Sequence, residues 1–135
     1  MSPILYAREA TLDPSEFVDV LQRSGLAERR PVDDRGRIER MLAHANLIVT
    51  ARDGNRLVGV SRALTDFAYC CYLSDLAVDR RYQRSGIGLR LIEETRRAAG
   101  PEAACILLSA PGALGFYRKI GMPQSDKAFV FERDR

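Results

Sequence analysis

Residues 76–89, LAVDRRYQRSGIGL, decide the fold, because an apolar segment passes through a basic loop into the start of a helix. The first N–H groups of a helix lack partners within it and carry partial positive charge, so they form a ready anion site. Gly86 and Gly88 lack the Cβ atoms that would keep a bulky phosphate away from these groups. Further positive charge comes from Arg80, Arg81 and Arg84. The stretch therefore suits a diphosphate.

Two other phosphate-binding loops do not fit this stretch. A P-loop needs Gly-Lys-Ser/Thr after a longer glycine spacing, and the chain has no such sequence. A dinucleotide fingerprint needs a third glycine where Leu91 stands, and an acidic residue about 20 positions onward, where residues 106–108 are apolar. Taken alone, the two glycines could simply permit a tight turn from strand to helix.

The order of predicted elements indicates one domain, residues 1–135, of the α+β class. Strands are expected over residues 4–10, 47–51, 57–64, 69–78, 104–109 and 128–132, and helices over 14–24, 34–44, 86–99 and 113–120. The uniformly apolar segment 104–109 is typical of a central strand covered on both faces. The helix before it favours parallel pairing with strand 69–78. Helices are expected on both faces of the sheet.

Composition favours a cytoplasmic protein without a membrane span. Of the 135 residues, 46% are hydrophobic, which is enough for a buried core, and the net charge is only +3. No run reaches the roughly 18 apolar residues of a membrane helix, and the start of the sequence is unlike a signal peptide. Basic and aromatic residues do not cluster as nucleic-acid binding would require.

The cysteines and the histidine point away from disulfide and metal chemistry. Cys70, Cys71 and Cys105 are an odd number in apolar, strand-like runs, which is typical of buried free thiols. The chain has one histidine, His44, which the pattern places at the end of a helix, so a zinc site lacks ligands. We expect no metal.

Two motifs together resemble the signatures of the GNAT superfamily of N-acetyltransferases. The first joins residues 76–78 to Gln83-x-x-Gly86-x-Gly88, and the second is Ala113-x-x-Phe116-Tyr117-x-Lys119-x-Gly121-Met122. The resemblance extends over roughly residues 4–131, because the order of elements agrees as well. The family often has an asparagine where this chain has Ala110, so a side-chain contact to the cofactor would be missing there.

The resemblance implies a mixed, largely antiparallel sheet in which the central parallel pair, strands 69–78 and 104–109, splays apart. Acetyl-CoA would be the cosubstrate, with its pantetheine arm in the opening, paired with main-chain groups of the first strand much as an added strand would be. The diphosphate would lie on the amides of residues 84–88. By this resemblance the cofactor-binding residues are Leu76, Ala77, Val78, Gln83, Arg84, Ser85, Gly86, Ile87, Gly88, Leu89 and Phe116.

The same resemblance implies direct attack of a primary amine on the thioester. Tyr117 matches the family's tyrosine, which as a general acid would protonate the departing thiolate; the alternative is a core aromatic. Asp75 is a candidate base, or else a solvated residue or ion-pair partner. Glu93 and Glu94 are expected on the outer face of their helix and Asp66 in a turn, so no base is assigned with certainty.

The acceptor remains open between a small-molecule amine and a protein amine. Arginines in and around the first two predicted helices would suit an acceptor that also carries a carboxylate or phosphate, but a solvated helix face is the favoured explanation for them. The competing class is a non-catalytic acyl-CoA-binding sensor or partner module, which could dispense with Tyr117. The family resemblance also allows a homodimer, to which the final strand would contribute.

Overall fold

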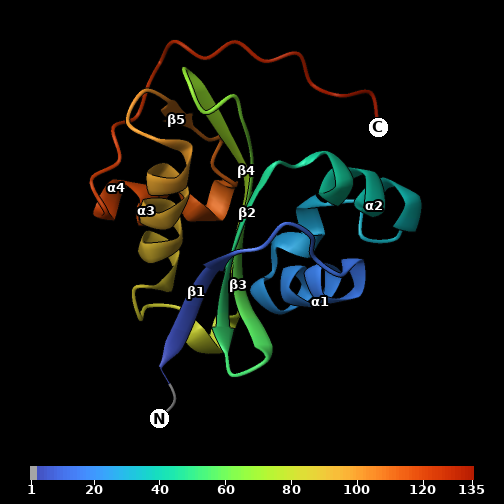
Figure 1. The fold of residues 1–135 in the computed structure, drawn as a ribbon. Coiled ribbons are helices and arrows are strands. Elements are labelled where there is room, and N and C mark those ends of the chain that lie inside the picture. Colours follow the sequence, from blue (N-terminus) through green and yellow to red (C-terminus); the bar gives the residue numbers. More distant parts are fainter. Residues whose placement is uncertain (1–2) are drawn as a thin grey trace.

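The computed structural model describes residues 3–135, which form a five-strand sheet with helices on both faces (Figure 1). The strands are β1 (Ile4–Arg8), β2 (Leu47–Asp53), β3 (Arg56–Thr65), β4 (Cys70–Val78) and β5 (Ala104–Ile106). The α-helices are α1 (Pro14–Ser24), α2 (Arg35–His44), α3 (Ile87–Ala99) and α4 (Leu114–Lys119). Short 3₁₀ turns are η1 (Leu26–Arg29), η2 (Arg80–Tyr82) and η3 (Pro111–Ala113).

The sheet is antiparallel except at one end, which confirms the predicted fold class. The strand order is β1-β2-β3-β4-β5, and only the β4–β5 pair is parallel within the described chain. This pair runs only from Cys70 opposite Ala104 to Tyr72 opposite Ile106. From Leu73 onward, β4 therefore has a neighbour on the β3 side alone, and its other edge opens.

Local sequence signals set the ends of the first two helices, α1 and α2. The Asp13 carboxylate accepts a hydrogen bond from the N–H of Ser15 at 2.8 Å, and Asp34 caps α2 in the same way. Gly25 ends α1 in the left-handed conformation, with φ of 90°. His44 is the last residue of α2, as predicted.

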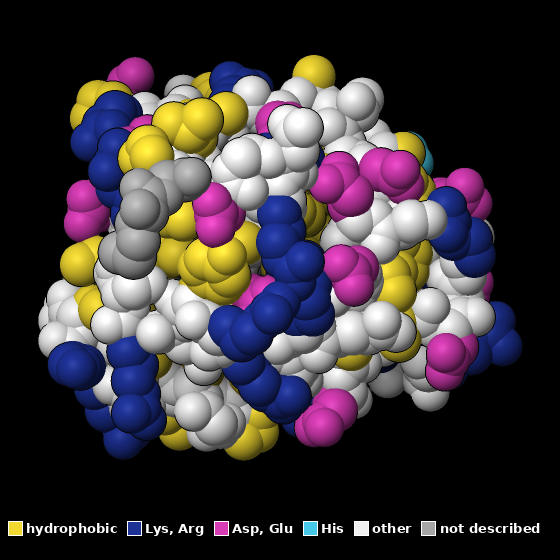
Figure 2. Space-filling view, turned by 90° about the horizontal axis from the view of Figure 1, so that it is seen from below, with side chains coloured by type: hydrophobic (Ala, Val, Ile, Leu, Met, Phe, Trp, Pro, Cys, Tyr) yellow, Lys and Arg dark blue, Asp and Glu magenta, His cyan; other side chains and the backbone are white. Residues whose placement is uncertain are grey.

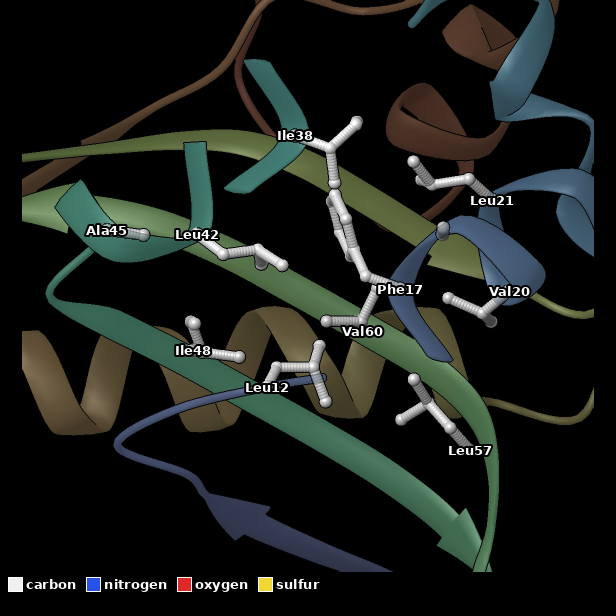
Figure 3. Packing of buried hydrophobic residues seen from close by; sticks show 11 residues of the cluster. Leu12, Phe17, Val20, Leu21, Ile38, Leu42, Ala45, Ile48, Leu57 and Val60 are labelled. Carbon is white, nitrogen blue, oxygen red and sulfur yellow. The ribbon is translucent and has the colours of Figure 1, made fainter. Parts of the chain in front are cut away.

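Two hydrophobic clusters hold the helices to the sheet. On one face, Phe17 of α1 packs with Ile38 of α2 and Val60 of β3 (Figure 3). On the other face α3 contributes Ile87 and Leu91. A Cβ on Gly59 would lie 3.1 Å from Leu91 Cδ1, so the glycine in β3 lets α3 approach the sheet closely. The sheet therefore forms a rigid wall between two helical layers.

Two predicted strands differ from the structure. β5 has three residues and lies at the end of the sheet, with Ile106 54% exposed, so the expectation of a central strand covered on both faces is wrong. Residues 128–132, which the structure describes, form no strand, and the predicted final strand is also wrong. Both segments have strand-like sequences, but a strand requires a partner for its backbone groups. Residues 104–106 have that partner on one side, in β4, whereas no strand among residues 3–135 pairs with 107–109 or 128–132.

The cysteines agree in part with the expectation of buried free thiols. All three cysteines are free; Cys71 is buried and Cys105 half-buried, whereas Cys70 is exposed, contrary to the prediction of a buried thiol. Within residues 3–135, no helix has the length and apolar character needed to cross a bilayer.

Candidate active site

The opening beside β4 exposes main-chain groups of an otherwise regular strand. The N–H of Asp79 donates to the carbonyl of Val58 in β3 at 2.8 Å. Because successive residues of a strand direct their N–H and C=O groups to opposite edges, Val78 and Leu76 direct theirs toward the opening, and Ala77 toward β3. The open edge thus offers donors and acceptors of the kind that pair with an extended, amide-containing ligand.

The loop between β4 and α3 forms a nest of free amides. Arg84 has φ of 66° and Gly86 has φ of 86°, and α3 begins without a side-chain cap. In the described part of the chain, no acceptor is recorded for the N–H groups of residues 84–88. Left-handed residues in such a turn aim successive N–H groups into one concavity, which suits an anion. A Cβ on Gly86 would meet nothing within 4 Å, so the concavity is open.

Polar side chains brace this loop from several directions. Gln83 donates from Nε2 to the Val78 carbonyl at 2.9 Å, and Ser85 donates its hydroxyl to the Tyr82 carbonyl. The Tyr82 hydroxyl donates to Asp53 in the β2–β3 hairpin at 2.7 Å. Gln83 and Ser85 are therefore engaged within the loop, which leaves its main-chain amides as the groups for a ligand.

Asp79 anchors the start of the loop to the helical layer. Its carboxylate is buried, accepts the N–H of Arg81 at 2.9 Å and pairs with the Arg23 guanidinium of α1. Burial by itself would raise the pKa of Asp79, but these hydrogen bonds and the charge of Arg23 bring the pKa below its ordinary value. Sequence reasoning missed this pair, because 56 positions separate its members.

Positive charge surrounds the loop, but the arginines at positions 80, 81 and 84 differ in whether protein groups already contact them. Figure 2 views the end of the molecule that carries the β4–α3 loop and shows a band of basic side chains across it. Arg81 lies 3.6 Å from Asp79, and the guanidinium of Arg80 packs against Gly25. Arg84 is exposed and has no ion pair among those found in residues 3–135. Arg84 is thus the arginine best placed to meet a ligand phosphate.

Helix α4 lies against the start of α3. A Cβ on Gly88 would come within 2.9 Å of Phe116 Cζ, so Gly88 makes room for this ring. The rings of Phe116 and Tyr117 meet edge to face, with centroids 5.1 Å apart. Both signature motifs are therefore in contact in space, although about thirty positions separate them in the sequence.

The Tyr117 phenol is half-buried near a positive charge. Burial raises its pKa above the ordinary value of 10.0, and the Arg30 guanidinium partly offsets this by favouring the phenolate. Arg30 belongs to the loop after η1, on the α1 and α2 face, whereas Phe116 touches α3 on the other face. Tyr117 thus adjoins the ring that packs on α3 and feels the charge of an arginine from the opposite face.

Asp75 is fully buried and paired with two arginines. Arg30 and Arg62 each donate from Nε to one carboxylate oxygen of Asp75. Arg30 also donates to the Ser74 carbonyl, and Arg62 to the Ser74 hydroxyl, both at 2.9 Å. Ser74 is the extra residue of a β-bulge, since Arg62 and Ala63 of β3 face Asp75 and Leu73. Of the alternatives for Asp75, the ion-pair partner matches these surroundings.

The remaining sequence-predicted residues have varied positions. Leu89 is exposed on α3, whereas the Ile87 side chain is buried, so Ile87 offers a ligand only its backbone. Glu93 is exposed as expected, but Glu94 pairs with Arg90 and Arg97. Asp66 accepts three N–H groups in the β3–β4 turn, which lowers its pKa to about 2. No cluster of metal-binding side chains occurs in the part of the chain described.

Known proteins match the chain in sequence and in structure. The family model described as an acetyltransferase (GNAT) domain matches residues 20–133. The GCN5-related N-acetyltransferase 1, chloroplastic, of Arabidopsis thaliana is 31% identical over 110 residues, covering 76% of this chain and 56% of that protein. The chain therefore spans little more than half the length of this relative.

Solved structures share the fold along nearly the whole chain. A GNAT family acetyltransferase of Streptococcus pneumoniae superposes with a TM-score of 0.77 at 24% identity, covering 98% of this chain and 100% of that one. An aminoglycoside acetyltransferase from an uncultured soil metagenomic sample, solved with sisomicin, gives 0.71 at 23% identity, covering 96% and 95%. The family match over residues 20–133, on this fold, shows that the chain belongs to the GNAT family of acetyltransferases.

Proposed function

We propose that this protein transfers the acetyl group of acetyl-CoA to a primary amine. The observation that carries the proposal is the nest of free amides at residues 84–88, which continues into the open edge of β4. The nest would hold the diphosphate, and the N–H groups of Leu76 and Val78 and the Leu76 carbonyl would pair with the pantetheine amides. The two surfaces would thus contact two adjoining parts of one elongated cofactor.

The reaction we propose is a direct transfer without an acyl-enzyme. The lone pair of the neutral amine attacks the thioester carbonyl, and a main-chain N–H at the open edge of β4 stabilises the oxyanion. The carbon–sulfur bond then breaks, and the Tyr117 phenol gives its proton to the departing thiolate. The proton that the amine loses after its attack passes to water. Asp75, which already binds two arginines, acts instead by holding Arg30 near Tyr117.

The acceptor class is best approached through compounds with several amines. The solved aminoglycoside acetyltransferase was crystallised with sisomicin, so aminoglycosides form the first panel, followed by polyamines, amino acids and lysine peptides. Consumption of the thioester is followed by its ultraviolet absorbance, because a thiol reagent would also react with the exposed Cys70. Amine-dependent consumption supports an enzyme, whereas CoA binding without consumption favours an acyl-CoA sensor.

The cofactor site is tested by Gly86→Glu. We expect this variant to lose the rise in melting temperature that CoA gives the wild type, because a carboxylate would repel the diphosphate in the nest. Gly100→Glu is the matched control, since Gly100 also has a positive φ and open space, at the other end of α3. Loss of stabilisation in both variants, or in neither, would contradict the assignment of the nest.

A further inference from the structure

The α1 and α2 face of the sheet holds a charge cluster whose two signs do not balance. Asp75 contributes one carboxylate, and Arg30 and Arg62 each contribute a guanidinium that donates to it. Neither arginine has another salt bridge within residues 3–135. Arg62 alone would neutralise the carboxylate, so Arg30 brings an excess positive charge. An unbalanced charge beside buried groups is costly, and it indicates a site that a mobile anion completes.

The charge cluster lies beside the opening in the sheet and apart from the nest. Pairing between β4 and β5 ends at Tyr72, and Asp75 comes just after the bulge at Ser74. Asp75 shares its face of β4 with Ala77, which packs with residues of α1 and α2. Val78, at the end of β4, is roughly 10 Å from Asp75 along the strand, and the nest lies beyond it. The excess charge is therefore not part of the diphosphate site.

Arg30 is the member of the charge cluster that a ligand can reach. Its side chain is 23% exposed, whereas that of Arg62 is 8% exposed. Arg30 donates to the Asp75 carboxylate and to the carbonyls of Ser74 and Arg29. A guanidinium has five N–H groups, so two of them have no recorded acceptor in the part of the chain described. Arg30 therefore combines excess charge with donors that are available to a ligand.

We propose that Arg30 binds a carboxylate of the acceptor, so that the substrate is a small molecule with both an amine and a carboxylate. This inference rests on the proposed function, in which the amine attacks the thioester at the opening beside β4. Two parallel N–H groups of a guanidinium match the two oxygens of a carboxylate. A carboxylate also balances the single excess charge, whereas a phosphate monoester brings about −1.5 to −2. The same excess charge would repel polyamines.

Arg30→Gln is the variant that removes the excess charge. Asp75 and Arg62 remain as a balanced pair, so the substitution leaves no uncompensated buried carboxylate and the fold should persist. Arg29→Gln is the matched control, because Arg29 is the exposed neighbour and has no salt bridge within residues 3–135. A rise in melting temperature with CoA should occur in both variants, which would show that each is folded and binds the cofactor.

The assay compares amino acids with their amides, which lack the carboxylate. Amino acids with the amine at the α, β or γ position cover different separations of the two groups. We expect the wild-type kcat/KM to be about 10- to 100-fold higher for the best amino acid than for its amide. Arg30→Gln should abolish this ratio, Arg30→Lys should keep part of it, and Arg29→Gln should keep all of it. The ratio is the readout, because an effect of Arg30 through Tyr117 would change both rates alike.

Failure of this inference can be distinguished from failure of the proposed function. Amides or polyamines that react as fast as amino acids would overturn the carboxylate site and leave the acetyltransferase proposal in place. A ratio that survives Arg30→Gln would do the same, because the carboxylate would then be bound elsewhere. If no amine causes consumption of acetyl-CoA, the proposed function is wrong, and the inference that rests on it is overturned as well.

Discussion

At the residue scale, the half-buried phenol of Tyr117 is the side chain that the proposed mechanism uses as proton donor. Because burial raises its pKa above 10.0, the phenol keeps its proton throughout the neutral range and is available to a thiolate. The nearby Arg30 charge would stabilise the phenolate formed after donation. A tyrosine that served only for packing would not need a cation near its phenol.

Tyr117→Phe is therefore expected to lower kcat by about 100-fold while the KM for acetyl-CoA changes little, because the ring remains in place. The wild-type rate should rise with pH as the amine loses its proton, without a fall caused by Tyr117 until the pH exceeds 10. Steady-state kinetics across pH measure both effects. An unchanged kcat in Tyr117→Phe would return this residue to the role of a core aromatic.

For Asp75 we expect an effect on stability, because its carboxylate neutralises the charges of two arginines. Asp75→Asn should destabilise the fold by about 3–5 kcal/mol, since removing one partner of a buried ion pair leaves the others uncompensated. Asp19→Asn, which affects an exposed pair with Arg23, should cost less than about 1 kcal/mol. Urea unfolding measures the difference. Full stability of Asp75→Asn combined with lost activity would instead support a catalytic base.

At the scale of elements, the parallel pair β4–β5 brings two cysteines side by side. Cys71 lies opposite Cys105, and burial together with the neighbouring thiol raises the pKa of Cys71 to about 11. The folded-state pKa lies above the ordinary value of 9.0, so this contribution to stability is complete below pH 9.0. It is lost as the pH rises through about 11.

Thiol labelling at pH 8 should therefore distinguish the three cysteines. Cys70 is exposed and should react with iodoacetamide first, whereas Cys71 should resist, because its reactive thiolate is scarce and buried. Peptide mass spectrometry after timed quenching gives the rates. Urea-unfolded protein is the control, in which all three cysteines should react at similar rates. Equal rates in the folded protein would show that β4 and β5 separate readily.

The elements also differ in how far the sequence predicts them. Asp13, Pro14 and Gly25 mark the ends of α1 by local capping, and the structure confirms those ends. The segment 104–109 and the segment 128–132 have equally clear strand sequences, yet only residues 104–106 form a strand. Helix signals are satisfied within a few residues, whereas a strand also depends on a neighbour that the local sequence does not specify.

At the scale of the whole molecule, ion pairs hold β4 and the loop after it, with Arg23 and Arg30 coming from the α1 side and Arg62 from the neighbouring strand β3. Arg23 reaches Asp79, and Arg30 and Arg62 reach Asp75, across 56, 45 and 13 positions respectively. The first pair supports the β4–α3 loop, and the second group supports the bulge beside the opening. The α1 and α2 layer therefore does more than cover the sheet, because it orients the groups around the site.

The amino-acid sequence by itself determined the GNAT resemblance, the phosphate loop and the order of most elements, because glycine positions, caps and apolar periodicity act over short distances. Only the tertiary structure decided that Asp75 is an ion-pair partner and that Gly88 accommodates Phe116. It also decided that the last apolar segment stands free. These features depend on contacts between residues that are distant in the sequence. Packing of the whole chain determines such contacts, and no local pattern specifies them.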